Sequence, residues 1–123
     1  MFDLTAEEAR LLLNVGLMAA GGNRFKSAAK IFAVLDRFRP DSPSVAVGKS
    51  ITLISAMKFV ECVDFIDEVA LRKFPGNAML KAFKGMALLR LGRDPEAKVV
   101  LAEAADQAGD PAAAQLAKGL LDD

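Results

Sequence analysis

Two stretches of the chain decide the fold: residues 16–32, GLMAAGGNRFKSAAKIF, and residues 85–101, GMALLRLGRDPEAKVVL. Each contains a glycine that is followed twelve residues later by an alanine, Gly16 and Ala28 in the first and Gly85 and Ala97 in the second. The two pairs are 69 residues apart, which equals two periods of about 34.5 residues. A period of about 34 residues is typical of repeats built from two antiparallel helices. The spacing therefore predicts a helical repeat protein.

A middle copy of the pattern begins 34 residues after the first, with Ser50 in place of the glycine and Cys62 in place of the alanine. Small side chains at these positions let the two helices of a repeat approach closely. Larger apolar residues that follow are expected to fill the space toward the next repeat. They are, copy by copy, Phe32, Ile66 and Leu101, and the pattern continues with Leu35, Val69 and Ala104.

Helix-start signals divide the chain at matching places. Thr5-Ala6-Glu7-Glu8 has the form of a capping box, and Ser42, Asp94 and Asp110 each precede a proline that suits the first helical position. Asn23 and Asn77 follow glycines and are also expected to be caps. Pro40 and Pro75 close the first two copies, and we place the one extra residue of the second copy in the turn at 74–77. The predicted helices cover residues 6–20, 24–38, 43–57, 59–73, 78–91, 95–108 and 111–121.

The segment 43–57 could also be interpreted as a strand, because Val and Ile residues are common in strands. A lone strand would have no partner in this chain, and the repeat favours a helix.

This pattern resembles the tetratricopeptide repeat. The resemblance implies an all-α fold in which residues 1–123 form a single α-solenoid domain. Three degenerate helix-turn-helix repeats are expected at about 6–40, 43–75 and 78–109, followed by a C-terminal capping helix at about 111–121.

Composition argues against several classes of function. Sixteen basic residues balance sixteen acidic ones without a basic tail, so an extended nucleic-acid footprint is not expected. Histidine is absent, which removes the Ser-His-Asp triad, the Cys-His pair and the usual zinc ligands. We therefore predict a protein that is not an enzyme and that needs no cofactor.

Two other features have a structural and a functional interpretation. Cys62 could be a reactive thiol, but its repeat position favours a buried packing residue. Glu61, Asp64 and Glu68 share one helix face and could suit a metal or a basic partner, although a solvated face is the preferred interpretation and no metal site is predicted.

Targeting signals are not expected either. The first four residues, MFDL, do not resemble a signal peptide. The longest uncharged run, residues 11–23, is too short to span a bilayer. Together with the single cysteine, these features predict a cytoplasmic protein without membrane insertion.

In tetratricopeptide-like arrays the first helix of each repeat lines a concave groove. The twelve positions expected to face it include only two that are not apolar, Arg10 and Ser44, each at the start of its helix. The Lys, Arg and Asn side chains with which some family members read a carboxylate terminus are missing. The ten apolar positions form the predicted partner-binding groove: Leu13, Leu17, Ala20, Val47, Ile51, Ile54, Met79, Ala82, Met86 and Leu89. Such a surface suits an amphipathic helix, and the methionines suit an adaptable surface.

The chain also resembles a narrower group, the tetratricopeptide-like needle-subunit chaperones of bacterial type III secretion and a related plant-pathogen group. The stretches that carry this resemblance are residues 11–18, LLLNVGLM, residues 85–92, GMALLRLG, and the ending from Asp110-Pro111 to Gly119-Leu120. The resemblance implies a cytoplasmic virulence-associated chaperone for protein transport. It would bind the amphipathic helix of the needle subunit, prevent premature polymerisation, and work with a small helical co-chaperone.

Two other uses of the groove remain open. The same residues could mediate homodimerisation in a self-associating scaffold or adaptor protein. Alternatively, they could simply form the core of a small array that curls inward.

Overall fold

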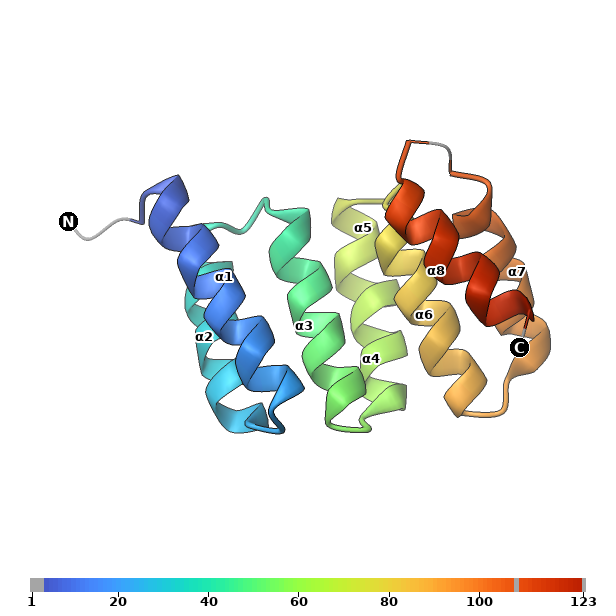
Figure 1. Ribbon diagram of the computed structural model, residues 1–123, viewed down its shortest axis with the longest axis horizontal. Helices are drawn as coiled ribbons and strands as arrows, with labels where there is room; N and C mark the ends of the chain where they lie inside the picture. The colour runs from blue at the N-terminus through green and yellow to red at the C-terminus, as the bar shows by residue number, and fades with distance from the viewer. Residues whose placement is uncertain (1–3, 108, 123) are drawn as a thin grey trace. The chain divides into compact units, whose positions relative to one another are not determined.

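The computed structural model describes residues 4–107 and 109–122, which are all-helical and contain no strand (Figure 1). Two expectations lie partly outside this range: the start of the chain, where no signal peptide is expected, and residue 108, the expected end of one helix. Within it, no helix is both long and apolar enough to cross a membrane.

The helices lie where the sequence predicts them, and the segment for which a strand was the alternative forms a helix over Pro43–Ser55. Each observed helix boundary lies within two residues of the predicted boundary, except the C-terminal end of α7. In order they are α1 (Ala6–Gly21), α2 (Phe25–Phe38), α3 (Pro43–Ser55), α4 (Phe59–Phe65), the π-helical segment η1 (Ile66–Ala70), α5 (Leu71–Lys73), α6 (Ala78–Arg90), α7 (Asp94–Ala105) and α8 (Pro111–Asp122).

The contacts group into two compact units where the sequence predicts a single domain: Met1–Lys58 and Phe59–Asp123. In the first unit, α1 packs against α2, and α3 packs against both. In the second, α6 packs against α7, α8 and α4, and α7 packs against α8. The boundary falls inside the expected second repeat, so α3 is described with the first unit and α4 with the second.

Most of the expected caps are present. Thr5 and Glu8 form the capping box of α1, with the Glu8 amide donating to Thr5 Oγ1 at 3.1 Å and the Thr5 amide to Glu8 Oε1 at 3.0 Å. The hydrogen bonds from the Thr5 backbone and side chain lower the pKa of Glu8. Side chains of Ser42, Asn77 and Asp110 likewise accept hydrogen bonds from backbone amides three residues later.

The caps expected at Asn23 and Asp94 are wrong. The N-caps of α2 and α7 are Arg24 and Arg93, and neither uses a side chain for capping. Asn23 instead adopts a left-handed conformation with φ 64°, and Asp94 is already the first residue of α7. The turn geometry, rather than the capping preference of asparagine, fixes this position.

The same turn occurs three times at the expected period. Its left-handed residue is Asn23, Met57 and Gly92 in turn, with φ of 64°, 61° and 75°. These positions are 34 and 35 residues apart. In each turn, the next residue donates its amide to a carbonyl five residues earlier, as in a Schellman motif: Arg24 to Ala19 at 2.8 Å, Lys58 to Leu53 at 2.8 Å and Arg93 to Leu88 at 2.9 Å. The period seen in the sequence is therefore a period in backbone conformation.

Met57 occupies the left-handed position with an unsuitable side chain. A non-glycine residue in this conformation costs roughly 1–2 kcal/mol of folding free energy. Glycine avoids that cost, and its own cost is mainly the greater conformational entropy of the unfolded chain. The Met57 side chain is 73% exposed and contributes little packing. We expect Met57→Gly to raise the free energy of unfolding by about 0.5–1 kcal/mol in urea titrations followed by circular dichroism. Met18→Gly, at an exposed position inside α1, is the control and should lower it by about 1 kcal/mol; a loss for both variants would contradict the argument.

The extra residue of the second copy lies inside a helix and not in the turn at 74–77. The helix ends of α2 and α5 match at a spacing of 35, because the C-caps Arg39 and Phe74 have nearly the same φ and ψ. The helix starts match at 34, so the π-helical segment Ile66–Ala70 absorbs the difference. This also corrects one expected equivalence: Val69, which the period pairs with Leu35, is 46% exposed, while Ala70, at 1%, takes the buried place equivalent to Leu35.

Phe32 is the central side chain of the first unit. It is 1% exposed and belongs to a buried cluster with Ala28, Leu35 and Val45. Two glycines make room for its ring: a Cβ atom on Gly16 would lie 3.0 Å from the ring, and one on Gly48 would overlap it. In the second unit, a Cβ on Gly85 would overlap Leu101 in the same way. The predicted pairing of a small residue with a large one is therefore present, and Gly48 is a partner that the repeat pattern did not reveal.

Candidate functional site

The two neighbouring helices α1 and α3 run in the same direction in the first unit (Figure 1). Five of the predicted groove residues lie on them and are half-buried: Leu13, Leu17, Val47, Ile51 and Ile54. We call these five residues the α1–α3 face. Because each keeps part of its apolar surface accessible, this face remains available for contact with another molecule.

Partial burial of the face has an identifiable cause. Leu13, Leu17 and Ile51 pack on one side against the core of the first unit. Val47 and Ile54 are not among the residues packed against that core cluster, although they are also half-buried. Substitutions at Val47 and Ile54 should therefore disturb the fold less than substitutions at the other three.

The second unit has predicted groove residues of its own on α6. Met79, Met86 and Leu89 are half-buried there. They occur on one helix at spacings of seven and three residues, which places them along one side of α6. This unit therefore also exposes part of an apolar helix surface.

Two predicted groove residues do not belong to any accessible surface. Ala20 and Ala82 are both fully buried. Ala20 joins the core cluster around Phe32, and α6, which carries Ala82, packs against three other helices. Their small side chains serve close helix packing, so they are removed from the candidate site.

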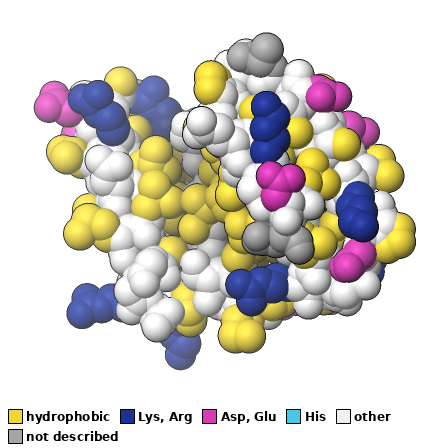
Figure 2. All heavy atoms as spheres, turned by 45° about the vertical axis from the view of Figure 1, so that its right-hand side comes forward, with side chains coloured by type: hydrophobic (Ala, Val, Ile, Leu, Met, Phe, Trp, Pro, Cys, Tyr) yellow, Lys and Arg dark blue, Asp and Glu magenta, His cyan; other side chains and the backbone are white. Residues whose placement is uncertain are grey.

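Sequence reasoning missed a second apolar stripe on α1. Leu11, Val15 and Met18 are exposed to 60%, 51% and 76%. Their spacing of four and three residues places them on one helix face. The repeat pattern pointed to Leu13 and Leu17 instead, and only the structure shows that this stripe is uncovered. Figure 2 shows hydrophobic side chains at the surface over much of the visible face, with charged side chains distributed among them.

A pocket of about 340 Å³ lies where α1 and α3 begin and α2 ends. Its polar side chains are Arg10, Arg39, Ser42 and Ser44, and none of its lining residues is acidic. Arg10 and Ser44 are the two positions that interrupt the apolar groove pattern. They are 34 residues apart, so the repeat itself could have brought them together on parallel helices. Arg39, which follows α2, had no signal in the sequence.

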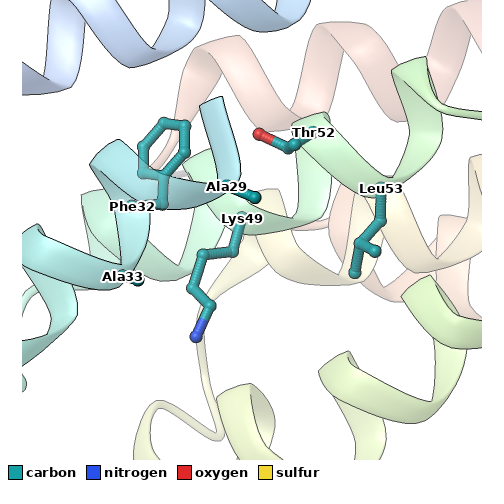
Figure 3. A pocket seen from close by; sticks show the side chains of 6 residues that line it. All are labelled: Ala29, Phe32, Ala33, Lys49, Thr52 and Leu53. Atoms are coloured by element: carbon teal, nitrogen blue, oxygen red, sulfur yellow. The ribbon is translucent and has the colours of Figure 1, made fainter. Parts of the chain in front are cut away.

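Another pocket, of about 140 Å³, lies between α2 and α3 (Figure 3). Its walls are mostly apolar, and the Lys49 side chain extends away from the Thr52 hydroxyl. Thr52 Oγ1 donates to the Gly48 carbonyl at 2.9 Å, and Lys49 Nζ lies 3.3 Å from Asp36 Oδ2. These polar groups are engaged with the protein itself, and no nucleophile is paired with a base there.

The remaining candidate residues have structural surroundings. Cys62 is buried, and its burial raises the pKa of the thiol to about 12, which suppresses the reactive thiolate. Glu61, Asp64 and Glu68 are exposed on the surface of the second unit. In the described part of the chain, no group of three His, Cys, Asp or Glu side chains is arranged to hold a metal ion.

Comparison with protein-family models, curated proteins and solved structures finds no match to this chain. The candidate site therefore rests on the geometry of the chain itself.

Proposed function

We propose that this protein is a non-catalytic chaperone that binds an amphipathic helix of another protein on its α1–α3 face. The observation that carries the proposal is the partial exposure of Leu13, Leu17, Val47, Ile51 and Ile54 on two parallel neighbouring helices. Two such helices present rows of side chains into which the ridge of a third helix can pack. Covering apolar surface contributes about 25 cal/mol per Å², which gives such a partner its affinity.

The family resemblance makes the partner more specific. The needle subunit of a bacterial type III secretion system is the partner to test first, with a small helical co-chaperone as a second component. Binding in the cytoplasm would cover the subunit's amphipathic helix and so prevent premature polymerisation before export. The apolar character of the α1–α3 face supports this role. A helix that polymerises through its apolar side stays monomeric only while that side is covered by another apolar surface.

A labelled amphipathic peptide tests the proposal. We expect a helical peptide of about 20 residues, with leucines at i, i+3, i+4 and i+7, to bind the wild-type protein in fluorescence anisotropy titrations. Val47→Lys and Ile54→Glu should each weaken binding about tenfold or more, because a charge would be buried against the apolar peptide. Val34→Lys, at an exposed position on α2, is the matched control and should bind as the wild type does.

Circular dichroism melts of the same variants separate binding from folding. Unchanged melting with lost binding supports the proposal. Unchanged binding in both face variants would contradict it. Light scattering on the protein alone addresses the alternative of a self-associating scaffold: a stable dimer that Ile54→Glu converts to a monomer would show that a second copy, and not a partner helix, covers the face.

A further inference from the structure

The pocket at the beginnings of α1 and α3 has the composition of an anion site. Arg10 and Arg39 bring two guanidinium groups to it, and Ser42 and Ser44 add hydroxyl groups. In the described residues, neither arginine has a carboxylate within ion-pair distance. Planar guanidinium groups bind carboxylates through paired, charge-assisted hydrogen bonds, and they keep their charge at all physiological pH values.

Arg39 is incompletely satisfied by the protein. Its Nη2 atom donates to the Leu4 carbonyl oxygen at 2.6 Å, which fixes the position of the side chain. Its Nε atom is buried and has no hydrogen-bond partner among the described residues. Buried donors of this kind normally have a partner, so the guanidinium group of Arg39 is not fully used by the described part of the chain.

The pocket is continuous with the α1–α3 face. Leu13 belongs to both, and Arg10 precedes it by one helical turn on the same side of α1. On α3, Ser44 likewise precedes Val47 by three residues. A ligand lying along the apolar face would therefore have one end at the two arginines.

The helix ends determine which end of the ligand that is. α1 and α3 both begin at the pocket. The first turn of α1 carries Glu7 and Glu8, which do not line the pocket, whereas α3 has no acidic residue in its first turn to offset the positive end of its dipole. The C-terminal end of a bound helix has the opposite polarity and a carboxylate if the chain ends there. Its N-terminal end would be repelled by the same groups.

We infer that this pocket is a carboxylate site that anchors the C-terminal end of the bound helix, which lies antiparallel to α1 and α3. This inference rests on the proposed function and names both the chemistry and the direction of the partner. The carboxylate is supplied by the chain terminus or by an Asp or Glu in the last turn of the partner, and the experiment separates the two.

Three versions of the amphipathic probe peptide test the site. One has a free C-terminal carboxylate, one is amidated, and one is amidated with a glutamate in its last turn. We expect either carboxylate to improve affinity about tenfold over the plain amide, as one charge-assisted pair would. The advantage should decrease when salt is raised from about 0.05 M to about 0.5 M. Whichever acidic peptide shows the larger advantage identifies the source.

Variants of Arg10 show whether the carboxylate advantage arises at this pocket, because the Arg10 side chain is exposed and can be replaced without disturbing the core. Arg10→Gln should reduce the carboxylate advantage by severalfold, while Arg10→Lys should restore part of it. Arg37→Gln, an exposed arginine on α2 outside the pocket, is the control and should change neither.

A nitroxide label near the peptide C-terminus gives the direction independently. It should broaden the amide resonances of Arg10 and Ser44 more than that of Ile54. The inference is overturned if the carboxylate gives no advantage, if Arg10→Gln leaves that advantage intact, or if the label broadens Ile54 instead. Each of these results would leave the proposed function standing, which is tested separately by peptide binding itself and by the Val47→Lys and Ile54→Glu variants.

Discussion

Replacing Phe32 by alanine is expected to lower the free energy of unfolding by about 3–5 kcal/mol. The ring is 1% exposed and lies between α1 and α3, where Gly16 and Gly48 leave room for it. Removing it leaves a cavity that rigid helix backbones cannot close, so the cavity term adds to the lost burial. Urea titration followed by circular dichroism measures the loss, because the chain has neither Trp nor Tyr for fluorescence.

Val34→Ala is the control on the same helix. Its side chain is exposed, so the free energy of unfolding should change by no more than about 0.5 kcal/mol. A loss below about 1 kcal/mol for Phe32→Ala would mean that the ring is not the central packing element of the first unit.

The second large effect is expected from the opposite change at the same contact. Gly48→Ala adds one methyl group where the Phe32 ring already fills the space. Overpacking a buried site costs typically about 1–3 kcal/mol, and we expect roughly 2 kcal/mol here because the ring is itself enclosed. The intrinsic preference of alanine for helices is too small to offset this cost.

Gly119→Ala is the matched control, since Gly119 is also helical and a Cβ atom there would meet nothing within 4 Å. That variant should gain up to about 1 kcal/mol from helix propensity. Combining Gly48→Ala with Phe32→Leu should recover part of the loss, because a smaller side chain makes room for the methyl group. Equal behaviour of the two glycine variants would contradict the proposed contact.

Local signals made the helices predictable. Capping side chains at Thr5, Ser42, Asn77 and Asp110 mark the starts, and the apolar spacing between them continues for whole helices. The repeat of small and large residues also predicted that Phe32, Ile66 and Leu101 would be buried. These features depend on residues that are close in sequence or on one fixed period, and both kinds of signal are visible in the sequence itself.

Features that depend on the exact turn geometry could not be predicted. Asn23 has the side chain of a cap but occupies the left-handed position that Met57 and Gly92 occupy elsewhere. Three such different residues share that conformation, so the surrounding hydrogen bonds, and not the residue type, impose it. Likewise, Gly48 has no small counterpart at the equivalent positions Asn14 and Phe83, and periodicity could not identify it.

The candidate site was predicted in part. Apolar residues at the expected positions of α1, α3 and α6 are half-buried. Ala20 and Ala82 are fully buried instead, because their small side chains lie where two helices pack closely together. The charged end of the α1–α3 face escaped prediction, since Arg39 lies after a helix end and reaches the pocket only through tertiary structure. A helical period locates residues on a helix face, and it carries no information about side chains from the loops.

The π-helical segment Ile66–Ala70 has a consequence for how such chains are compared with one another. Sequence alignments usually place gaps in loops, and here that choice would pair exposed Val69 with the core residue Leu35. Placing the gap inside the helix pairs Leu35 with buried Ala70 and keeps the prolines Pro40 and Pro75 in step. A search for distant relatives of this chain should therefore allow a one-residue insertion in the middle of a helix.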